Sequence, residues 1–194
     1  MTHMEWIAAL LGIVCVALAA VRSVWTFPTG IASVALVGFV VFSARLYSDA
    51  LLQLFFVAAN LYGWMRWRSV TSMAGEVVVE RMRPAARLRW AAGIVVAGVI
   101  WGAAMHRLTD ASYPWWDAAI AAASIAAQVL MARRKIENWV LWIAVDLASI
   151  PLYVAKGLTT LAALYLVYLL LAVWGLIGWV RAQRRPLAAA AVAA

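Results

Sequence analysis

Long apolar runs separated by short polar junctions dominate the pattern of this chain. Seven of them approach the length of about 20 residues that an α-helix needs to cross a bilayer. They cover residues 5–21, 27–44, 48–66, 90–106, 115–132, 136–155 and 158–180. Most junctions hold an arginine, a lysine or a glycine. The pattern predicts an all-α integral membrane protein with seven transmembrane helices.

One connection, residues 67–89, is longer than the others and rich in arginine. Its middle, residues 76–84, could form a short strand or a segment at the membrane surface. The alanine-rich residues after Pro186 are expected to be disordered. The predicted organisation is a first three-helix unit (5–67), a cytoplasmic linker (68–89), a linker helix (90–106), a second three-helix unit (115–180) and a cytoplasmic tail (181–194).

The distribution of basic residues predicts the orientation. If the N-terminus is outside, thirteen of the sixteen Lys and Arg residues fall at cytoplasmic junctions, and only Arg45, Arg107 and Lys156 lie outside. Cytoplasmic loops of membrane proteins carry such an excess of positive charge. We therefore expect a multi-pass protein of the cell (inner) membrane with a cytoplasmic C-terminus.

Composition excludes a soluble domain. The chain is 68% hydrophobic and 12% charged, with a mean hydropathy of +0.92, and a soluble surface needs more polar cover than that. The net charge of +8 does not indicate nucleic-acid binding, because the arginines stand between apolar runs and not in one stripe. The single cysteine, Cys15, is expected to be a small buried residue. The first run lacks a basic start and a cleavage site, so we expect a retained helix.

The chain contains an internal repeat. The first three runs align without a gap on the last three at a constant offset of 112 residues, which pairs Arg22 with Arg134, Gly63 with Gly175 and Trp67 with Trp179. Three helices, one linker helix and three more keep both units in the same orientation. This 3+1+3 plan is a parallel repeat of the SWEET type, and substrate sites in such carriers lie near the midplane between the repeats.

The segment 136–155 carries the strongest functional signal. Trp139, Trp142, Asp146, Ser149 and Tyr153 fall on one face of a helix. A carboxylate at membrane depth is costly and usually faces a bundle interior or a wet cavity. Indole rings beside a carboxylate suit an aromatic cation, through stacking and cation–π attraction. The face therefore predicts a substrate site.

Two other segments offer faces that could complete the site. Gln53 and Asn60 share one face of the third run with aromatic residues, and Tyr165 and Tyr168 lie on the equivalent face of the seventh. We expect an amide-and-aromatic wall opposite the wall of segment 136–155. Pro28 and Pro151 are candidate hinges for gating, or simply tolerated kinks.

Structural roles compete with each of these assignments. Trp139 and Trp142 could belong to the aromatic belt, and Asp146 could pair with a buried donor. Gln53 and Asn60 could make interhelical hydrogen bonds. The tryptophans at segment ends are expected to be belt residues: Trp64, Trp67, Trp90 and Trp179. His3 and His106 are too far apart to form a metal site, and no cofactor is expected.

These motifs resemble those of PnuC-type vitamin transporters. The run Leu46–Trp64 resembles the family's third helix, and Glu137–Trp142, followed by Val145-Asp146, Ile150–Tyr153 and Lys156–Leu158, also resembles the family. Trp116-Asp117 also fits the family's pattern. The chain differs from many members in its short N-terminus and compact linker.

The resemblance implies a seven-helix SWEET-like fold and facilitated diffusion of a vitamin, most commonly nicotinamide riboside, with thiamine and riboflavin as alternatives. It implies substrate contacts at Asn138, Trp139 and Trp142, with contributions from Gln53 and Asn60. It also implies a cytoplasmic kinase that traps the substrate by phosphorylation. The expected partners are this vitamin, the lipid bilayer and the kinase, with the oligomeric state open.

Other classes of seven-helix or membrane protein fit less well. A membrane enzyme needs clustered His, Cys, Asp or Glu residues, whereas only Asp146 lies deep in a segment. A retinal photoreceptor needs a lysine in its last helix, and the run 158–180 has none. We therefore expect a carrier and not an enzyme.

Overall fold

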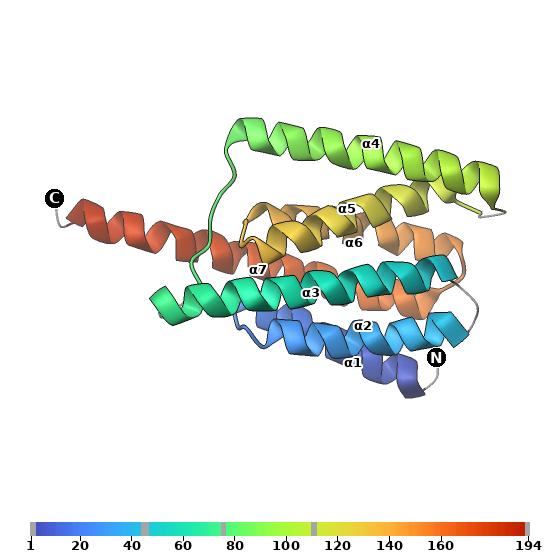
Figure 1. Cartoon of the computed structure of the whole chain (residues 1–194), viewed down its shortest axis with the longest axis horizontal. Coiled ribbons are helices and arrows are strands. Elements are labelled where there is room, and N and C mark those ends of the chain that lie inside the picture. The colour runs from blue at the N-terminus through green and yellow to red at the C-terminus, as the bar shows by residue number, and fades with distance from the viewer. Residues whose placement is uncertain (1–2, 44–46, 75–76, 110–111, 193–194) are drawn as a thin grey trace.

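The computed structural model describes the backbone of residues 3–43, 47–74, 77–109 and 112–192 and has seven helices in these ranges (Figure 1). They are α1 (His3–Ala20), α2 (Thr26–Ser43), α3 (Tyr47–Ala74), α4 (Pro84–Leu108), α5 (Pro114–Ala132), α6 (Glu137–Ala155) and α7 (Thr159–Val192). The all-helical prediction is confirmed. The N- and C-terminal ends lie at opposite ends of the bundle. The junction residues Arg45, Leu46 and Asp110 lie outside the described residues.

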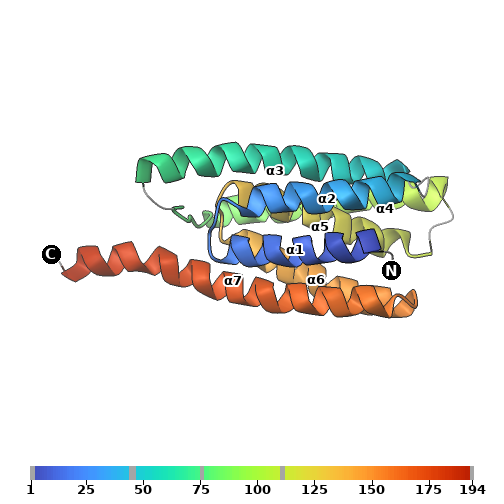
Figure 2. The same ribbon diagram turned by 90° about the horizontal axis from the view of Figure 1, so that it is seen from below.

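Six helices are long and apolar enough to cross a membrane, and α3 is not among them. Gln53, Asn60, Arg66 and Arg68 lower the hydropathy of α3, yet it runs alongside the other helices in both views (Figures 1 and 2). Three helices exceed their predicted lengths: α3 ends at Ala74, α4 begins at Pro84, and α7 continues to Val192. The disorder expected after Pro186 was therefore wrong for 187–192, where alanine, the strongest helix former, prolongs the helix.

The helices form a closed ring with a two-fold pattern of contacts. In the described part of the chain, α1 packs on α2 and α2 on α3, while α5 packs on α6 and α6 on α7. Contacts of α1 with α7 and of α3 with α5 close the ring, and α4 packs on α5 alone. Exchanging the first three helices with the last three reproduces every contact of the ring. This pattern supports the parallel repeat.

The turns between the first two helices of each unit match in atomic detail. Arg22 and Arg134 are the two non-glycine residues with positive φ in the described ranges, at 62° and 59°. Such a conformation is uncommon for a non-glycine residue. In both turns the arginine backbone N–H donates to the carbonyl three residues earlier, from Arg22 N to Ala19 O and from Arg134 N to Met131 O. Arg22 and Arg134 are 112 residues apart, and so are the two acceptors, Ala19 and Met131.

The aromatic core is duplicated with the same offset. Phe27 meets Trp67 edge-on with ring centroids 5.0 Å apart, and Trp139 meets Trp179 in the same way at 5.7 Å. The indole N–H of Trp67 donates to Met131 O and that of Trp179 donates to Ala19 O. These bonds join the two units reciprocally. Together the four rings form the aromatic cluster of the protein.

Burial overturns the belt assignment for two of these residues. Trp67 and Trp179 are fully buried, and each indole N–H is satisfied by a carbonyl at the end of a helix in the other unit. Two glycines make room for the neighbouring rings. A Cβ at Gly63 would collide with the Phe27 ring, and one at Gly175 would lie 2.6 Å from the Trp139 indole.

The linker crosses this end of the bundle in an extended conformation. Val77 and Val79 are buried in the aromatic cluster, whereas Val78 faces outward. Glu80 forms a parallel bridge with Lys135, through bonds of 2.9 Å from Glu80 N to Arg134 O and from Ile136 N to Glu80 O. The segment is therefore one extended strap rather than a strand of a sheet.

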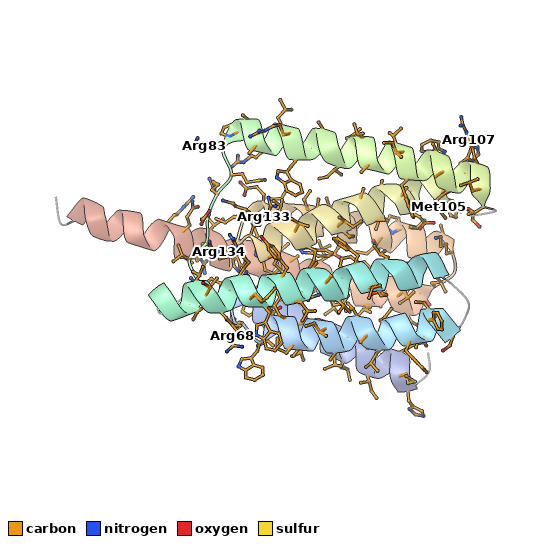
Figure 3. All side chains as sticks on the ribbon, in the orientation of Figure 1. Arg68, Arg83, Met105, Arg107, Arg133 and Arg134 are labelled. Atoms are coloured by element: carbon orange, nitrogen blue, oxygen red, sulfur yellow. The ribbon has the colours of Figure 1, made fainter. Side chains whose placement is uncertain are left out.

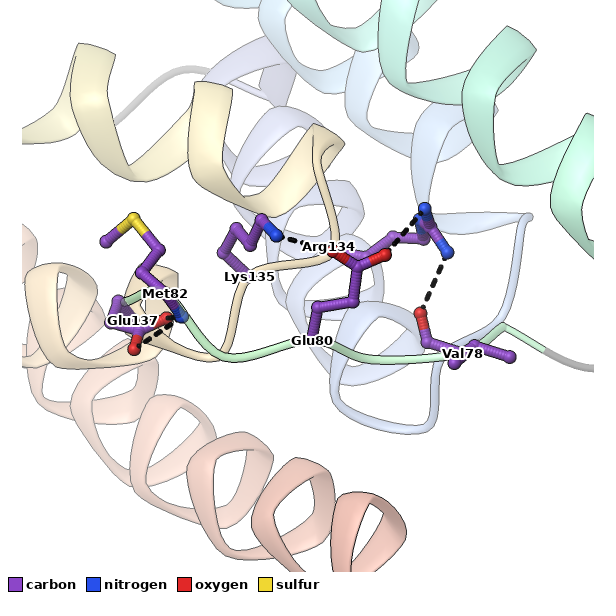
Figure 4. Close-up of polar contacts among 6 residues, drawn as sticks. All are labelled: Val78, Glu80, Met82, Arg134, Lys135 and Glu137. Atoms are coloured by element: carbon purple, nitrogen blue, oxygen red, sulfur yellow. Dashed lines mark hydrogen bonds and ion pairs between the residues drawn. The ribbon is translucent and has the colours of Figure 1, made fainter. Parts of the chain in front are cut away.

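Side chains fasten the strap to the second unit (Figure 4). Glu80 binds Lys135 and the Arg134 guanidinium, which also donates to Val78 O at 3.1 Å. Glu137 accepts from Met82 N and forms an ion pair with Arg87. The hydrogen bond from Lys135 lowers the pKa of Glu80, and the nearby positive charges add to this effect. Figure 3 shows Arg68, Arg83, Arg133 and Arg134 at this linker end and Arg107 at the other.

Candidate functional site

Asp146 is the deepest charge in the described part of the chain. It lies at the middle of α6 and is 3% exposed. It has no hydrogen bond or ion pair with any described residue. One turn further along α6, the Ser149 hydroxyl is buried and also lacks a partner. An unpaired polar group in hydrocarbon is costly, so this stretch of α6 is a candidate site for a polar ligand.

Three tyrosines form the wall beside Asp146. The rings of Tyr153 on α6 and Tyr165 on α7 have centroids 5.0 Å apart, and the rings of Tyr165 and Tyr168 are 5.7 Å apart. The Asp146 carboxyl lies close enough to interact electrostatically with Tyr165 and Tyr168. The structure thus brings Asp146 and Tyr153 of α6 together with Tyr165 and Tyr168 of α7. A carboxyl group flanked by aromatic rings can hold an aromatic cation.

The first unit contributes the opposite wall. The Tyr168 hydroxyl lies against Gly12 of α1, where a Cβ would collide with it. Gly30 of α2 lies between Cys15 and Asn60: a Cβ there would be 2.9 Å from Asn60 Oδ1 and 3.0 Å from Cys15 Sγ. The predicted Asn60 is therefore buried where α1, α2 and α3 of the first unit meet, and its Nδ2 donates to Phe56 O of its own helix.

Sequence reasoning missed part of this wall. The wall also includes Gly12, Gly30 and Cys15, whose thiol donates to Thr26 O at 3.2 Å. Cys15 was expected to be a small buried residue, and it is largely buried but polar in its contacts. The signal was available in the spacing of Gly12 and Gly30 within apolar runs, since such glycines often mark close approach.

Asn138 and Trp139 lie near the linker end of α6, in a separate region. Both are buried, and Trp139 belongs to the aromatic cluster. Asn138 Nδ2 donates to Lys135 O at 2.6 Å, which leaves Asn138 Oδ1 and Trp139 Nε1 buried without a partner among the described residues. Trp139 thus differs from Trp67 and Trp179, whose indole nitrogens are both satisfied.

The remaining predicted residues occupy peripheral positions. Trp142 is half-buried against the aromatic cluster. Gln53 packs beside Gly38, with 3.3 Å between its Cβ and a Cβ placed on the glycine. Pro28 lies in the first turn of α2, where a missing N–H costs no helical bond. Pro151 lies inside α6 and removes one such bond, so it is the better placed of the two hinge candidates.

A groove of about 450 Å³ lies elsewhere, between α4 and α5. It shares no residue with the polar cluster around Asp146. The chemistry of its lining is apolar with one arginine, so it does not suit the predicted substrate. We therefore place the candidate site between the two units.

The chain matches known membrane transporters along nearly its whole length. Residues 2–181 match the family described as nicotinamide mononucleotide transporter. The chain is 28% identical over 209 residues to the nicotinamide riboside transporter PnuC of Escherichia coli (strain K12), covering 95% of this chain and 87% of that protein. It is 34% identical over 194 residues to the riboflavin/roseoflavin transporter RibM of Streptomyces davaonensis, covering 94% and 88%. A crystal structure of the vitamin B3 transporter PnuC matches with a TM-score of 0.78 and 28% identity, covering 94% of this chain and 82% of that chain.

Proposed function

The chain belongs to the nicotinamide mononucleotide transporter family, and from this premise we propose that it carries nicotinamide riboside by facilitated diffusion. Its relatives are named transporters of nicotinamide riboside or riboflavin. Several apolar helices make it a multi-pass membrane protein. The residues of this chain favour one of these substrates.

Asp146 favours a cationic substrate. Nicotinamide riboside bears a positive pyridinium ring, whereas riboflavin is neutral. A buried carboxyl without a described partner, next to the rings of Tyr165 and Tyr168, offers the pyridinium a counter-charge and aromatic faces. The Ser149 hydroxyl, which has no partner among the described residues, can hydrogen-bond a ribose, and Asn60 Oδ1 is proposed as a second acceptor. A neutral ligand would leave the carboxyl uncompensated.

Asn138, Trp139 and Trp142 complete the proposed substrate path. Asn138 Oδ1 and Trp139 Nε1 lie on the linker side of Asp146, and neither atom has a hydrogen-bond partner among the described residues. Trp142 lies between them and Asp146 along α6. We propose that these groups contact the substrate on the linker side of the site. Gln53 is proposed as a contributor nearer the other end.

Alternating access follows from the two-unit plan. Rocking of one unit against the other exposes a midplane site first to one side and then to the other, as in SWEET-like carriers. We propose that the linker end is cytoplasmic, because the arginine-rich turns and strap lie there. Pro151 is the proposed hinge within the second unit.

The proposed carrier equilibrates its substrate and does no work on it. The sequence holds no nucleotide-binding loop, and a single deep carboxylate makes no proton relay. Net uptake then depends on a cytoplasmic kinase that phosphorylates the vitamin. The phosphorylated product is retained because the site has no described arginine or lysine at membrane depth to bind a phosphate.

Purified protein in sealed liposomes tests this proposal. Labelled nicotinamide riboside should enter down its gradient and stop at equal concentrations, apart from the bias that membrane voltage gives a cation. Imposed proton or sodium gradients should not move that endpoint. Accumulation that follows an ion gradient at clamped voltage would overturn the uniporter, and Asp146 would become the candidate coupling site.

Riboflavin is the second candidate, and the 34% identity to RibM favours it. Calorimetric binding of nicotinamide riboside, thiamine and riboflavin to the same preparation separates the possibilities. Tight binding of the two cationic vitamins, or of nicotinamide riboside alone, agrees with the role given to Asp146. Preference for riboflavin would reject that role.

A further inference from the structure

The groove between α4 and α5 is a wedge that opens toward the linker end. Near the other end the helices touch, since a Cβ at Gly102 would lie 2.5 Å from the Trp115 ring. At Gly98 the nearest atom is Ala119 Cα at 3.7 Å, and at Gly93 nothing lies within 4 Å. Figure 1 shows the same divergence of the two helices. The groove is lined by Ala86, Arg89, Trp90, Gly93, Ile94, Ala97, Ala122, Ile125 and Ala126.

Two arginines without carboxylate partners stand at the open end of the wedge. Arg89 lines it, and the Arg133 guanidinium lies 5.9 Å from the centre of the Trp90 ring. Neither has an ion pair with a described residue. Nearby Arg87 and Lys135 differ, because their charges are compensated by Glu137 and Glu80 respectively.

We propose that this wedge binds one anionic phospholipid from the linker-side leaflet. The acyl chain lies in the groove against Gly93, Ala97 and Ala122, and the phosphate meets Arg89 and Arg133. Basic pockets between transmembrane helices bind anionic headgroups, and an indole such as Trp90 favours the headgroup level. Because α4 packs on α5 alone, the lipid tethers this outlying helix to the ring.

A second copy of the chain fits the wedge less well. A helix about 10 Å wide fills the groove's volume with roughly one turn, whereas a slender acyl chain can follow its length. A helix from another copy would also cover both guanidinium groups without supplying a counter-charge. An anionic headgroup supplies that charge and stays at the water interface.

The first experiment compares headgroups on the purified full-length protein in detergent. Dioleoylphosphatidylglycerol or dioleoylphosphatidylcholine is titrated, and bound lipid is counted by native mass spectrometry. We expect the anionic dioleoylphosphatidylglycerol to bind preferentially. Arg89→Gln with Arg133→Gln should weaken it about 30-fold, at about 1 kcal/mol per basic residue near the surface.

The matched control removes equal charge elsewhere. Arg68→Gln with Arg107→Gln takes away one arginine that lies over an indole, 6.0 Å from the Trp64 ring, and one at the far end of α4. It should leave lipid binding unchanged. Equal binding of the two lipids by the unmodified protein, or equal losses in the two double variants, would overturn the proposal.

A second experiment fills the groove without touching charge. Gly93→Phe places a ring where a Cβ meets nothing within 4 Å, so the fold should tolerate it. Lipid binding should fall, whereas Val96→Phe on the exposed face of α4 should not reduce it. Gly93→Cys tests the other occupant. A disulfide-linked dimer formed in membranes through Cys at this position, with lipid binding absent, would assign the wedge to a second copy and refute the lipid site.

Discussion

Replacing Asp146 by asparagine should separate charge recognition from shape. Asparagine keeps the volume of the side chain and its hydrogen-bonding oxygen but removes the negative charge. At an effective dielectric constant of about 20, two unit charges about 5 Å apart attract by about 3 kcal/mol. That corresponds to roughly a hundredfold loss of affinity for a cationic substrate.

A reduced form of the substrate supplies the control ligand. Dihydronicotinamide riboside has nearly the same shape as nicotinamide riboside but no pyridinium charge. Calorimetric titration of Asp146→Asn should show the large loss for the cation and little change for the reduced form. Asp117→Asn removes a carboxylate paired with Lys156 at 2.9 Å near the end of the bundle, and it should change neither affinity.

Stability gives a second, independent measurement. The buried carboxyl group has no described partner, so Asp146→Asn removes no interaction with a described residue and should not lower the melting temperature of the ligand-free protein. The reasoning is refuted if Asp146→Asn weakens binding of both ligands equally. It is also refuted if the variant unfolds at a markedly lower temperature, since Asp146 would then be paired structurally.

Three further outcomes test other parts of the structure. Nicotinamide mononucleotide should bind at least about tenfold more weakly than the nucleoside in calorimetry, because the candidate site has no described arginine or lysine at membrane depth for its phosphate; comparable affinities would refute this site. Trp139→Phe should lower substrate affinity and cost only the stability lost with the smaller ring. Trp179→Phe should cost about 1 kcal/mol more, through its lost bond to Ala19 O, and leave affinity intact; thermal melts and titrations distinguish them. Glu80→Gln should cost less than about 1 kcal/mol, because the Glu80 side chain is 44% exposed and its ion pairs are screened. Since the folded-state pKa of Glu80 lies below 4.5, this contribution should be present at neutral pH and disappear as the pH falls through that lowered value; a loss already at pH 6 in hydrogen exchange of residues 77–82 would contradict it.

The sequence was sufficient for the helices, their number and the repeat register, because apolar length and turn residues are local signals. It could not reveal that Trp67 and Trp179 are core residues. A tryptophan at the end of a helix is ambiguous between the belt and the core, and the decision depends on a carbonyl about 60 or 160 residues away, at Met131 or Ala19. The conformation of the strap was ambiguous for the same reason, since Glu80 pairs with a distant turn at Lys135 and not with a neighbouring strand.

The polar and aromatic residues of the candidate site were predicted from the sequence, whereas the glycines that lie beside them in the structure were not. Polar and aromatic residues in apolar runs can be recognised from the sequence alone, as for Asp146, Ser149, Tyr165 and Tyr168. Gly12 and Gly30 contribute by the absence of a side chain, and that absence has meaning only when a neighbour is known. Composition therefore indicates the chemistry of a membrane site more readily than its shape.

The two units share structural features but differ at the candidate site. The turn at Arg22 and Arg134, the paired rings and the reciprocal indole bonds are all preserved in both units, and these features hold the units together. The positions equivalent to Asp146 and Trp142 are instead Val34 and Gly30. A two-fold scaffold can move symmetrically between its two open states, whereas a single small cation needs only one counter-charge. A second buried carboxylate at position 34 would raise the desolvation cost without a second cation to compensate it. Under the proposed function, the symmetric features are those that the rocking motion would need, and the asymmetric ones are those that would meet the substrate.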